Sequence, residues 1–496
     1  RQPEELIAAL EATAREATTY FGDGTVYAER YLEDPRHIEV QVFGDNHGNA
    51  IHLFERECSV QRRYQKIIEE CPSPSVNTEL RQRITSAAVK ITQAIGYSNA
   101  GTIEFLLEGD KDFFFLEMNT RIQVEHPVTE MVTGVDLVEE QILVAAGNPL
   151  SIKQDALILN GNAIECRIYA EDPQRGFLPS PGKMTFYSLP EGENIRVESG
   201  INRNLEVPAD YDPMVAKVIV WGRDRSLAIE RMEMALRETV IHGIASNIPF
   251  LMSLLRHPDY RENRISTKYI DARLESLLPV PPTGSQTPLA AYILWWLNTG
   301  RRPSAQRPLD VWDSIGYWRQ YAEFRLMLNS LPHRLSIGFH SANAYRLLID
   351  GAPADARILE VDNHRIRFTL EDSMYAAYVS EDGQGKAWIS LEGELNHLER
   401  EDILVTEDVF TSSGSGSGGD PGRIISPMPG KVVKINVKEG DQVKRGQLIL
   451  IVEAMKMENN ILAPADGLVD AVNVKAGDNV DTRLALVHLS VIEEGD

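Results

Sequence analysis

Two predicted strands in the first third of the chain carry side chains of the kind that bind divalent metal ions. Residues 102–108 and 113–119 flank a four-residue turn. Pairing across this turn places Glu104 opposite Glu117, with Asn119 two residues further along the same face. Directly opposed carboxylates repel each other, so a cation is expected between them. Oxygen ligands on a sheet suit Mg²⁺, which commonly uses one or two carboxylates together with substrate phosphates.

The same pairing makes a second prediction about this hairpin. It sets Glu108 against Phe113, and it places Phe113 and Phe115 on the face that carries Glu117. Two glutamates on a solvated face are the alternative interpretation. The phenylalanines on that face favour metal binding, because they indicate a face that is partly covered.

Residues 120–127 offer ligands for a planar anion next to this site. Arg121, Gln123 and Glu125 alternate with apolar residues. An arginine can hold a planar anion with two parallel hydrogen bonds, and a glutamate further along the segment could act as a general base on it. Residues 61–66 add further cations, which alone could be a solvated basic patch or a weak nucleic-acid motif. In so acidic a chain an anion pocket is favoured.

The composition excludes some classes of partner. The chain has 50 basic and 73 acidic residues, and its net charge of −23 makes it a poor general nucleic-acid binder. Its apolar runs are shorter than the ~18 residues of a membrane span. The cysteines Cys58, Cys71 and Cys166 lack metal-ligand spacing. They suit a reducing compartment, either a bacterial cytoplasm or a mitochondrial matrix.

Two stretches rich in proline, glycine or serine divide the chain, residues 278–284 and 411–422. They leave segments 1–278, 285–410 and 423–496. The first segment mixes helical and strand patterns, which favours an α+β or α/β fold. In it, a helix is predicted from Pro3 to about residue 14, and residues 37–43 alternate like a strand with one face in water.

The middle segment is predicted to hold a helix and an antiparallel barrel or sandwich. The helix covers residues 289–297, and the strand-like runs are 324–328, 334–339, 345–349, 365–370 and 387–391. No catalytic constellation stands out in it. We interpret this segment as an interaction domain rather than a second enzyme.

The last segment contains an internal repeat with an offset of 37 residues. The first copies are Pro427, Gly430, Val437, Lys438, Gly440, Asp441 and Val443. Each half reads as a strand, a Gly-Asp turn and a strand, so the two halves predict a small flattened barrel. The hairpin that joins them, residues 453–460, places Lys456 at an exposed tip. A solvated turn lysine is the alternative to a lysine that carries a covalent group.

This segment resembles the biotinyl domains of biotin-dependent enzymes, whose fold the lipoyl domains share. Met455 and Met457 flank Lys456, and residues 427–430 read Pro-Met-Pro-Gly, as in the biotinyl version. The resemblance implies that a biotin protein ligase attaches biotin to Lys456.

Residues 1–278 resemble the later two-thirds of biotin carboxylase, an ATP-grasp enzyme. The matching runs are 31–39, 57–66, 117–130 and 165–172. The resemblance implies that the N-terminal domain of that enzyme, with its nucleotide-binding lysines and Gly-rich lid, is absent. The chain is therefore expected not to carboxylate biotin alone.

The resemblance also implies roles for single residues. Glu104, Glu117 and Asn119 would hold Mg²⁺ or Mn²⁺ against the ATP phosphates. The bicarbonate ligands would be Lys66, Arg121, Gln123 and the backbone near Val124. Glu125 would deprotonate bicarbonate as it forms carboxyphosphate, and Arg167 would stabilise the biotin enolate.

Nucleotide contacts are implied for four further residues. Glu29 and Leu32 would contact adenine, and His37 and Gln61 would face the ribose and the phosphates. Tyr64 stands where relatives often have histidine.

The whole arrangement resembles the α subunit of acyl-CoA carboxylases. It implies a multidomain α+β protein with an ATP-grasp core, a middle domain in which an antiparallel barrel surrounds a helix, and an all-β biotinyl barrel. In that family the middle domain docks a carboxyltransferase β subunit, which binds the acyl-CoA, in a large hetero-oligomer. Roughly 130 middle residues are too few for the carboxyltransferase domain of a pyruvate or urea carboxylase.

The sequence indicates the family but leaves the acyl group of the substrate open. Acetyl-CoA or propionyl-CoA is the main expectation, with 3-methylcrotonyl-CoA or geranyl-CoA as the alternative. Two other classes remain open: a carrier and docking module without catalysis, and a lipoyl-bearing acyl carrier.

Overall fold

The structure is a computed structural model. It describes residues 6–109, 112–201, 206–209, 211–279, 286–299, 322–341, 343–382, 385–401, 422–426, 430–454, 457–480 and 484–491. The predicted linker up to residue 421, Pro3, Pro427 and Lys456 lie outside these residues. Among the described helices, none is both long and apolar enough to cross a bilayer.

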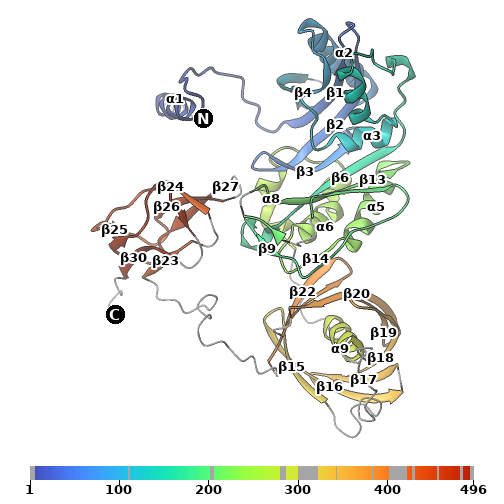
Figure 1. The fold of residues 1–496 in the computed structure, drawn as a ribbon, viewed down its shortest axis with the longest axis vertical. Helices are drawn as coiled ribbons and strands as arrows, with labels where there is room; N and C mark the ends of the chain where they lie inside the picture. Colours follow the sequence, from blue (N-terminus) through green and yellow to red (C-terminus); the bar gives the residue numbers. More distant parts are fainter. Residues whose placement is uncertain are drawn as a thin grey trace.

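One antiparallel sheet of eight strands organises the first half of the chain (Figure 1). In sheet order the strands are β11 (Ile195–Ser199), β13 (Met214–Gly222), β6 (Asn162–Tyr169), β3 (Gln65–Cys71), β2 (Ala50–Arg62), β1 (Arg36–Gly44), β4 (Asn99–Glu108) and β5 (Asp112–Asn119). We call it the main sheet. Arg63 and Tyr64 form the turn between β2 and β3, both with positive φ as a type I′ hairpin turn requires.

Helices cover this sheet and bury its apolar side chains. They are α2 (Thr78–Ala94), α3 (His126–Thr133), α4 (Leu137–Ala145), α5 (Arg225–Glu238), α6 (Ile248–Arg256), α7 (Pro258–Arg261) and α8 (Tyr269–Leu277). The side chain of Asn77 caps α2 by accepting from the Leu80 amide, and Asp224 caps α5 in the same way. α2 packs on β1 and β2, and apolar side chains are buried between them. α5 packs on β13, where a second apolar core forms.

Short elements complete this region. They are the strands β7 (Glu171–Asp172), β8 (Leu178–Pro179), β9 (Gly182–Lys183), β10 (Phe186–Ser188), β12 (Glu206–Val207) and β14 (Val240–His242), with 3₁₀ turns at Gln154–Ala156 and Pro173–Arg175. The predicted N-terminal helix is confirmed from Leu6 and runs on to Phe21 as α1.

The prediction that residues 37–43 have one face in water is wrong. β1 lies in the interior of the main sheet, and the polar residues of its alternating pattern are buried: His37, Glu39 and Gln41 are 6%, 0% and 0% exposed. Their face is covered by charged and amide side chains rather than by water.

The middle segment forms a closed barrel around one helix, so the predicted barrel is confirmed (Figure 1). The helix α9 (Thr287–Thr299) is apolar all round, and its residues 289–294 are fully buried in the same core as the barrel strands. The strands are β15 (Ala322–Leu328), β16 (Leu331–Ser341), β17 (Ala344–Ile349), β18 (Ala352–Val361), β19 (Arg365–Leu370), β20 (Ser373–Glu381), β21 (Lys386–Leu391) and β22 (Glu394–Arg400). Sequence analysis missed β18, β20 and β22.

The last segment forms two four-stranded sheets around a third core, as predicted. One sheet holds β23 (Arg423–Ile425), β25 (Gln442–Val443), β28 (Gly467–Val472) and β30 (Ala485–Val491). The other holds β24 (Gly430–Ile435), β26 (Leu448–Ala454), β27 (Met457–Leu462) and β29 (Asn479–Val480).

The repeat appears as paired hydrogen bonds across this segment. The amide of Val432 donates to the carbonyl of Asp478, and 37 residues on, the amide of Val469 donates to that of Asp441, both at 2.9 Å. The side chains of Asp441 and Asp478 also accept from Lys438 and Lys475 amides at 2.9 and 2.8 Å. The two halves therefore have the predicted two-fold relation.

Candidate functional site

Glu104 and Glu117 are opposite each other, as the sequence predicts, but the register of the rest of the hairpin differs from the prediction. Glu104 is paired with Glu117, while Glu108 is paired with Asp112 instead of Phe113. Phe105 pairs with Phe115 and the preceding Glu104 pairs with Glu117, so Leu116 has no partner on β4. This bulge shifts the register by one residue.

This bulge corrects the predicted place of the phenylalanines. The rings of Phe113 and Phe115 contact the Phe105 ring, at centroid distances of 5.4 and 6.4 Å. Side chains alternate along β4, so the two phenylalanines lie on the face opposite Glu104. Phe113 and Phe115 consequently do not cover the carboxylates.

Asn119 joins the two carboxylates. Its Nδ2 donates to Glu104 Oε1 and to Glu117 Oε1, each at 2.9 Å, and its Oδ1 accepts from Arg121 Nη2 at 3.0 Å. Two carboxylates and an amide oxygen are the ligand types of Mg²⁺, so the residues fit that ion. Although burial alone would raise it, the hydrogen bond from His37 and the charges of His37 and Lys66 lower the pKa of Glu104 to about 2.

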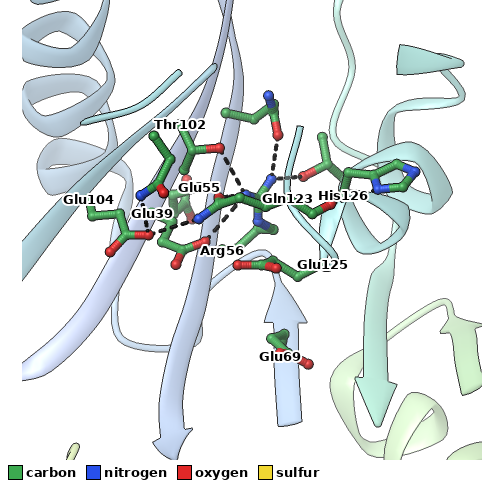
Figure 2. A network of polar contacts seen from close by, with 12 residues as sticks. Glu39, Glu55, Arg56, Glu69, Thr102, Glu104, Gln123, Glu125 and His126 are labelled. Carbon is green, nitrogen blue, oxygen red and sulfur yellow. Dashed lines mark hydrogen bonds and ion pairs between the residues drawn. The ribbon is translucent and has the colours of Figure 1, made fainter. Parts of the chain in front are cut away.

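Lys66 contacts three carboxylates, those of Glu39, Glu104 and Glu125, which are labelled in Figure 2. Its Nζ is 2.6 Å from Glu125 Oε1 and 3.4 Å from Glu104 Oε1, and it also contacts Glu39. Burial disfavours the ammonium, but the charges of Glu39 and Glu125 outweigh this and raise the pKa of Lys66. The side chain is therefore a fixed positive charge.

Arg167 holds the other oxygen of Glu125. Its Nη2 donates to Glu125 Oε2 at 2.9 Å, and its Nε donates to Glu69 Oε1 at 2.6 Å. Glu125 is 2% exposed and stands just before the first residue of α3. A buried carboxylate thus lies between two cations from neighbouring strands, β3 and β6. We call these three residues the Lys66–Glu125–Arg167 cluster.

The segment that carries Glu125 is a loop and not a strand. β5 ends at Asn119 and α3 begins at His126, and the amide of His126 donates to the carbonyl of Gln123 at 3.3 Å. This turn buries Gln123 and Glu125 and leaves Arg121 exposed. Gln123 Nε2 donates to Glu104 Oε1 at 2.8 Å, which connects the loop to the opposed carboxylates.

Two more predicted residues lie in the same network. His37 Nε2 is 2.9 Å from Glu104 Oε2, and Gln61 is the cross-strand partner of Lys66. Val124 contributes its carbonyl, which accepts from Lys217 Nζ. Tyr64, at the β2–β3 turn, is 93% exposed.

The predicted adenine residues lie apart from these carboxylates. Leu32 is buried and Glu29 is exposed. Between them Tyr31 accepts a hydrogen bond from Lys268 Nζ at 2.7 Å. Lys268 lines a cavity of about 520 Å³ whose other lining residues include Asp34, Arg36, Leu107, Ile265 and Arg273.

Several residues of the network were missed by sequence analysis. They are Glu39, Arg56, Glu69 and Lys217, all less than 10% exposed. The alternation of His37, Glu39 and Gln41 would have identified Glu39 if the strand had been predicted to lie inside the sheet. For the others the sequence offered no comparable pattern.

The predicted carrier hairpin is confirmed, although Lys456 itself lies outside the described residues. β26 and β27 pair antiparallel up to Ala454 and Met457. In the sequence, Met455 and Lys456 are the residues between these two positions.

Three family models match the chain. They are described as carbamoyl-phosphate synthase L chain, ATP binding domain, over residues 1–153; biotin carboxylase C-terminal domain, over residues 165–272; and biotin-requiring enzyme, over residues 422–489.

Solved structures of biotin carboxylases match the first half. That of Campylobacter jejuni, in complex with an ATP ligand, is 48% identical with a TM-score of 0.53, over 55% of this chain and 60% of that one. The biotin carboxylase domain of Hydrogenobacter thermophilus 2-oxoglutarate carboxylase, with MgADP and bicarbonate, is 44% identical with a TM-score of 0.55, over 56% and 62%.

Relatives of known name match nearly the whole chain. The mitochondrial methylcrotonoyl-CoA carboxylase subunit alpha of Dictyostelium discoideum is 40% identical over 92% of this chain and 67% of its own length. The mouse protein of the same name is 36% identical over 93% and 65%. The chain thus spans about two thirds of the length of these relatives. With an ATP-grasp region, a helix-filled barrel and a biotinyl segment in this order, the chain belongs to the family of biotin-dependent acyl-CoA carboxylase α subunits.

Proposed function

We propose that this chain carries biotin on Lys456, takes part in its ATP- and bicarbonate-dependent carboxylation, and passes the carboxyl group to 3-methylcrotonyl-CoA at a separate carboxyltransferase β subunit. The observation that carries the proposal is the position of Glu125, buried between Lys66 and Arg167. A carboxylate so placed can remove a proton from an anion that the two cations hold.

Bicarbonate is the anion that suits these side chains. Lys66 and Arg167 supply positive charge, Gln123 supplies an amide donor, and the exposed Arg121 can approach from the solvent side. Charges that are already in place stabilise negative charge as it develops on the reacting oxygens, at little reorganisation cost. Burial of Glu125 and Gln123 keeps water from the reacting atoms.

ATP would approach along β4 and β5. We place its adenine end near Glu29 and Leu32, and its phosphates near His37 and Glu104, which contact each other at 2.9 Å. Mg²⁺ or Mn²⁺ held by Glu104, Glu117 and Asn119 supplies charge that neutralises the phosphates. Biotin supplies the ring nitrogen that accepts the carboxyl group.

The three segments take different parts in this function. We assign residues 1–278 to the carboxylase, 285–410 to docking of the β subunit, 411–422 to a linker and 423–496 to the carrier. The barrel supports the docking role because its core is filled by α9, which leaves its outer surface for a partner.

The acyl-CoA is assigned from the relatives rather than from the site. The expectation of acetyl-CoA or propionyl-CoA gains no support, because the relatives that match over at least 92% of this chain are named for methylcrotonoyl-CoA. We therefore favour 3-methylcrotonyl-CoA, the former alternative.

The test is fixation of ¹⁴C-bicarbonate by the natural complex, purified with its partner, on acetyl-, propionyl-, 3-methylcrotonyl- and geranyl-CoA. We expect ATP-dependent fixation that is fastest with 3-methylcrotonyl-CoA. Lys456→Arg should abolish both fixation and streptavidin binding, whereas Lys475→Arg, at a turn of the same segment, should alter neither. Absence of ATP-dependent fixation with all four substrates would show the proposal to be wrong.

A further inference from the structure

Arg56 is a fully buried arginine in the middle of the main sheet. It lies on β2, its side chain is 0% exposed, and it contacts five polar side chains from four separate segments (Figure 2). Its partners are Gln41 and Thr129 on Nη1, at 2.7 and 3.2 Å, and Glu39, Thr102 and Gln123 on Nη2, at 3.2, 3.3 and 2.9 Å. Arginine is almost never fully buried unless it is paired, so the environment is specific for it.

The bond to Gln123 determines which way that amide faces. A guanidinium can donate hydrogen bonds but cannot accept them. Arg56 Nη2 must therefore face the oxygen of the amide, Gln123 Oε1. The Gln123 Nε2 group is then turned to the opposite side, where it donates to Glu104 Oε1 at 2.8 Å. Arg56 and Glu104 thus fix the amide orientation from opposite sides, and loss of Arg56 would remove one of these two constraints.

A second contact connects Arg56 to Lys66. Glu39 places Oε2 on Arg56 and Oε1 on Lys66, so this one buried carboxylate is shared by two cations. Loss of the Arg56 charge would leave Glu39 with Lys66 as its main counter-charge. The lysine would then be held more strongly by Glu39 and be less available to an anion beside Glu125.

We propose that Arg56 is a positioning residue for bicarbonate: it orients the Gln123 amide toward the anion and, through Glu39, leaves the Lys66 ammonium free to bind it. The inference rests on the proposed function, since bicarbonate is the anion it concerns. Arg56 itself touches no reacting atom.

A purely structural role is the competing explanation, because a buried ion pair also stabilises the fold. Arg225 offers a matched control. It donates to Glu70 from Nε and Nη2, at 2.6 and 3.0 Å, and Glu70 is 5% exposed. Neither residue contacts the Lys66–Glu125–Arg167 cluster within the described part of the chain.

The experiment compares Arg56→Lys, Arg56→Met and Arg225→Met in the full natural complex. For Arg56→Met we expect the KM for bicarbonate in ATP cleavage to rise about tenfold or more, with the KM for ATP changed by less than about twofold. Arg56→Lys keeps the charge beside Glu39, so its KM for bicarbonate should lie between those of the wild type and Arg56→Met. Line broadening of ¹³C-bicarbonate by each protein measures binding without turnover and should weaken in the same order.

Coupling to Gln123 gives a second readout. Gln123→Ala should raise the KM for bicarbonate in the wild-type background but should add little in an Arg56→Lys background, because both changes remove the same amide contact. Additive effects would show that Arg56 does not act through Gln123.

The outcomes separate this inference from the function it rests on. Absent bicarbonate-dependent ATP cleavage in the wild type overturns both. If the wild type is active and Arg56→Lys binds bicarbonate normally, only the positioning role is wrong. The positioning role is also wrong if the melting temperatures of the Arg56 and Arg225 variants fall equally and the KM for bicarbonate stays unchanged in both. Should Arg56→Met fail to fold, Arg56→Lys decides.

Discussion

At the scale of single residues, the site is a set of buried charges that neutralise one another. Lys66 and Arg167 share Glu125, while Arg56 and Lys66 share Glu39. Removal of one member leaves its partners buried with one counter-charge fewer, which is destabilising. Variants that preserve shape and change only charge are therefore the most informative.

Glu125→Gln keeps the size of the side chain and removes its ability to accept a proton. We expect bicarbonate-dependent ATP cleavage to fall about a hundredfold or more, the usual range for loss of a general base. Glu198→Gln, which changes a carboxylate 2.9 Å from Lys217, is the control and should retain most activity. Equal losses in the two variants would argue against a base at position 125.

Glu165 makes a prediction about pH. It is fully buried, its carboxylate oxygens have no hydrogen-bond partner among the described residues, and it is paired with Glu69 across β3 and β6. Burial, and then the charge of Glu69, raise the pKa of Glu165 well above its usual value. The folded state thus binds a proton that the unfolded state releases above about pH 4.5.

Stability should therefore be highest at acidic pH and fall as the pH rises toward the folded-state pKa of Glu165. Glu165→Gln, a neutral mimic, should remove most of this decline. Melting temperatures between pH 5 and 8 provide the measurement. Parallel curves for the wild type and the variant would mean that Glu165 is ionised in the folded protein.

At the scale of elements, hairpins place the functional groups. The bulge at Leu116 brings Glu117 opposite Glu104, and β26 and β27 pair up to Ala454 and Met457, which flank Met455 and Lys456 in the sequence. In the carrier segment, Gly440 and Gly477 occupy equivalent Gly-Asp turns with φ of 89° and 95°. A side chain at either position would meet open space, so its only cost is backbone strain.

Gly477→Val should destabilise the carrier segment by about 1–2 kcal/mol, the cost of a left-handed conformation for a residue with a Cβ. Gly477→Asn should cost less, because asparagine tolerates that conformation. Hydrogen exchange of β28 and β30 in the full chain reports the effect. Equal protection in the two variants would contradict a purely conformational cost.

At the scale of the whole molecule, the barrel contacts the carboxylase region at the two-stranded sheet of β10 and β14, and Figure 1 shows β14 next to the barrel. His242 is fully buried there, with Nδ1 2.9 Å from Ser380 Oγ and Nε2 2.9 Å from Ser390 Oγ. The rings of Phe186 and His364 stack with centroids 4.3 Å apart. Side chains of both regions thus interlock, which restricts motion between them.

This contact should weaken in acid. Burial, followed by the nearby His364 and His397, lowers the pKa of His242 to about 3. The neutral ring is favoured in the docked state, so its stabilising contribution is complete above about pH 6.5 and is lost as the pH falls toward 3. We expect the hydrogen-exchange protection factors of β20 and β21 to fall below about pH 6.

His242→Gln keeps a neutral hydrogen-bonding side chain and should abolish this pH dependence, whereas His242→Leu removes one hydrogen-bond partner from each of the two serines and should loosen the contact at every pH. Acid sensitivity that persists unchanged in His242→Gln would assign it to another group.

The sequence by itself determined the features that depend on neighbours in the chain. The repeat and its joining hairpin depend on turn residues and strand alternation, and the motif around Lys456 is continuous. The pairing of Glu104 with Glu117 was also predictable, since a hairpin places its two strands side by side, although the compensating bulge was not.

Only the tertiary structure decided which polar residues are buried. The sequence pattern of His37, Glu39 and Gln41 predicts a strand face in contact with water. In the structure, β2, β4 and the loop before α3 enclose these side chains. The roles of Arg56, Glu69 and Lys217 depend on partners 15 to 98 positions away in the sequence. Whether a charge on a strand meets water or a counter-charge depends on how distant elements pack, and no local pattern records that packing.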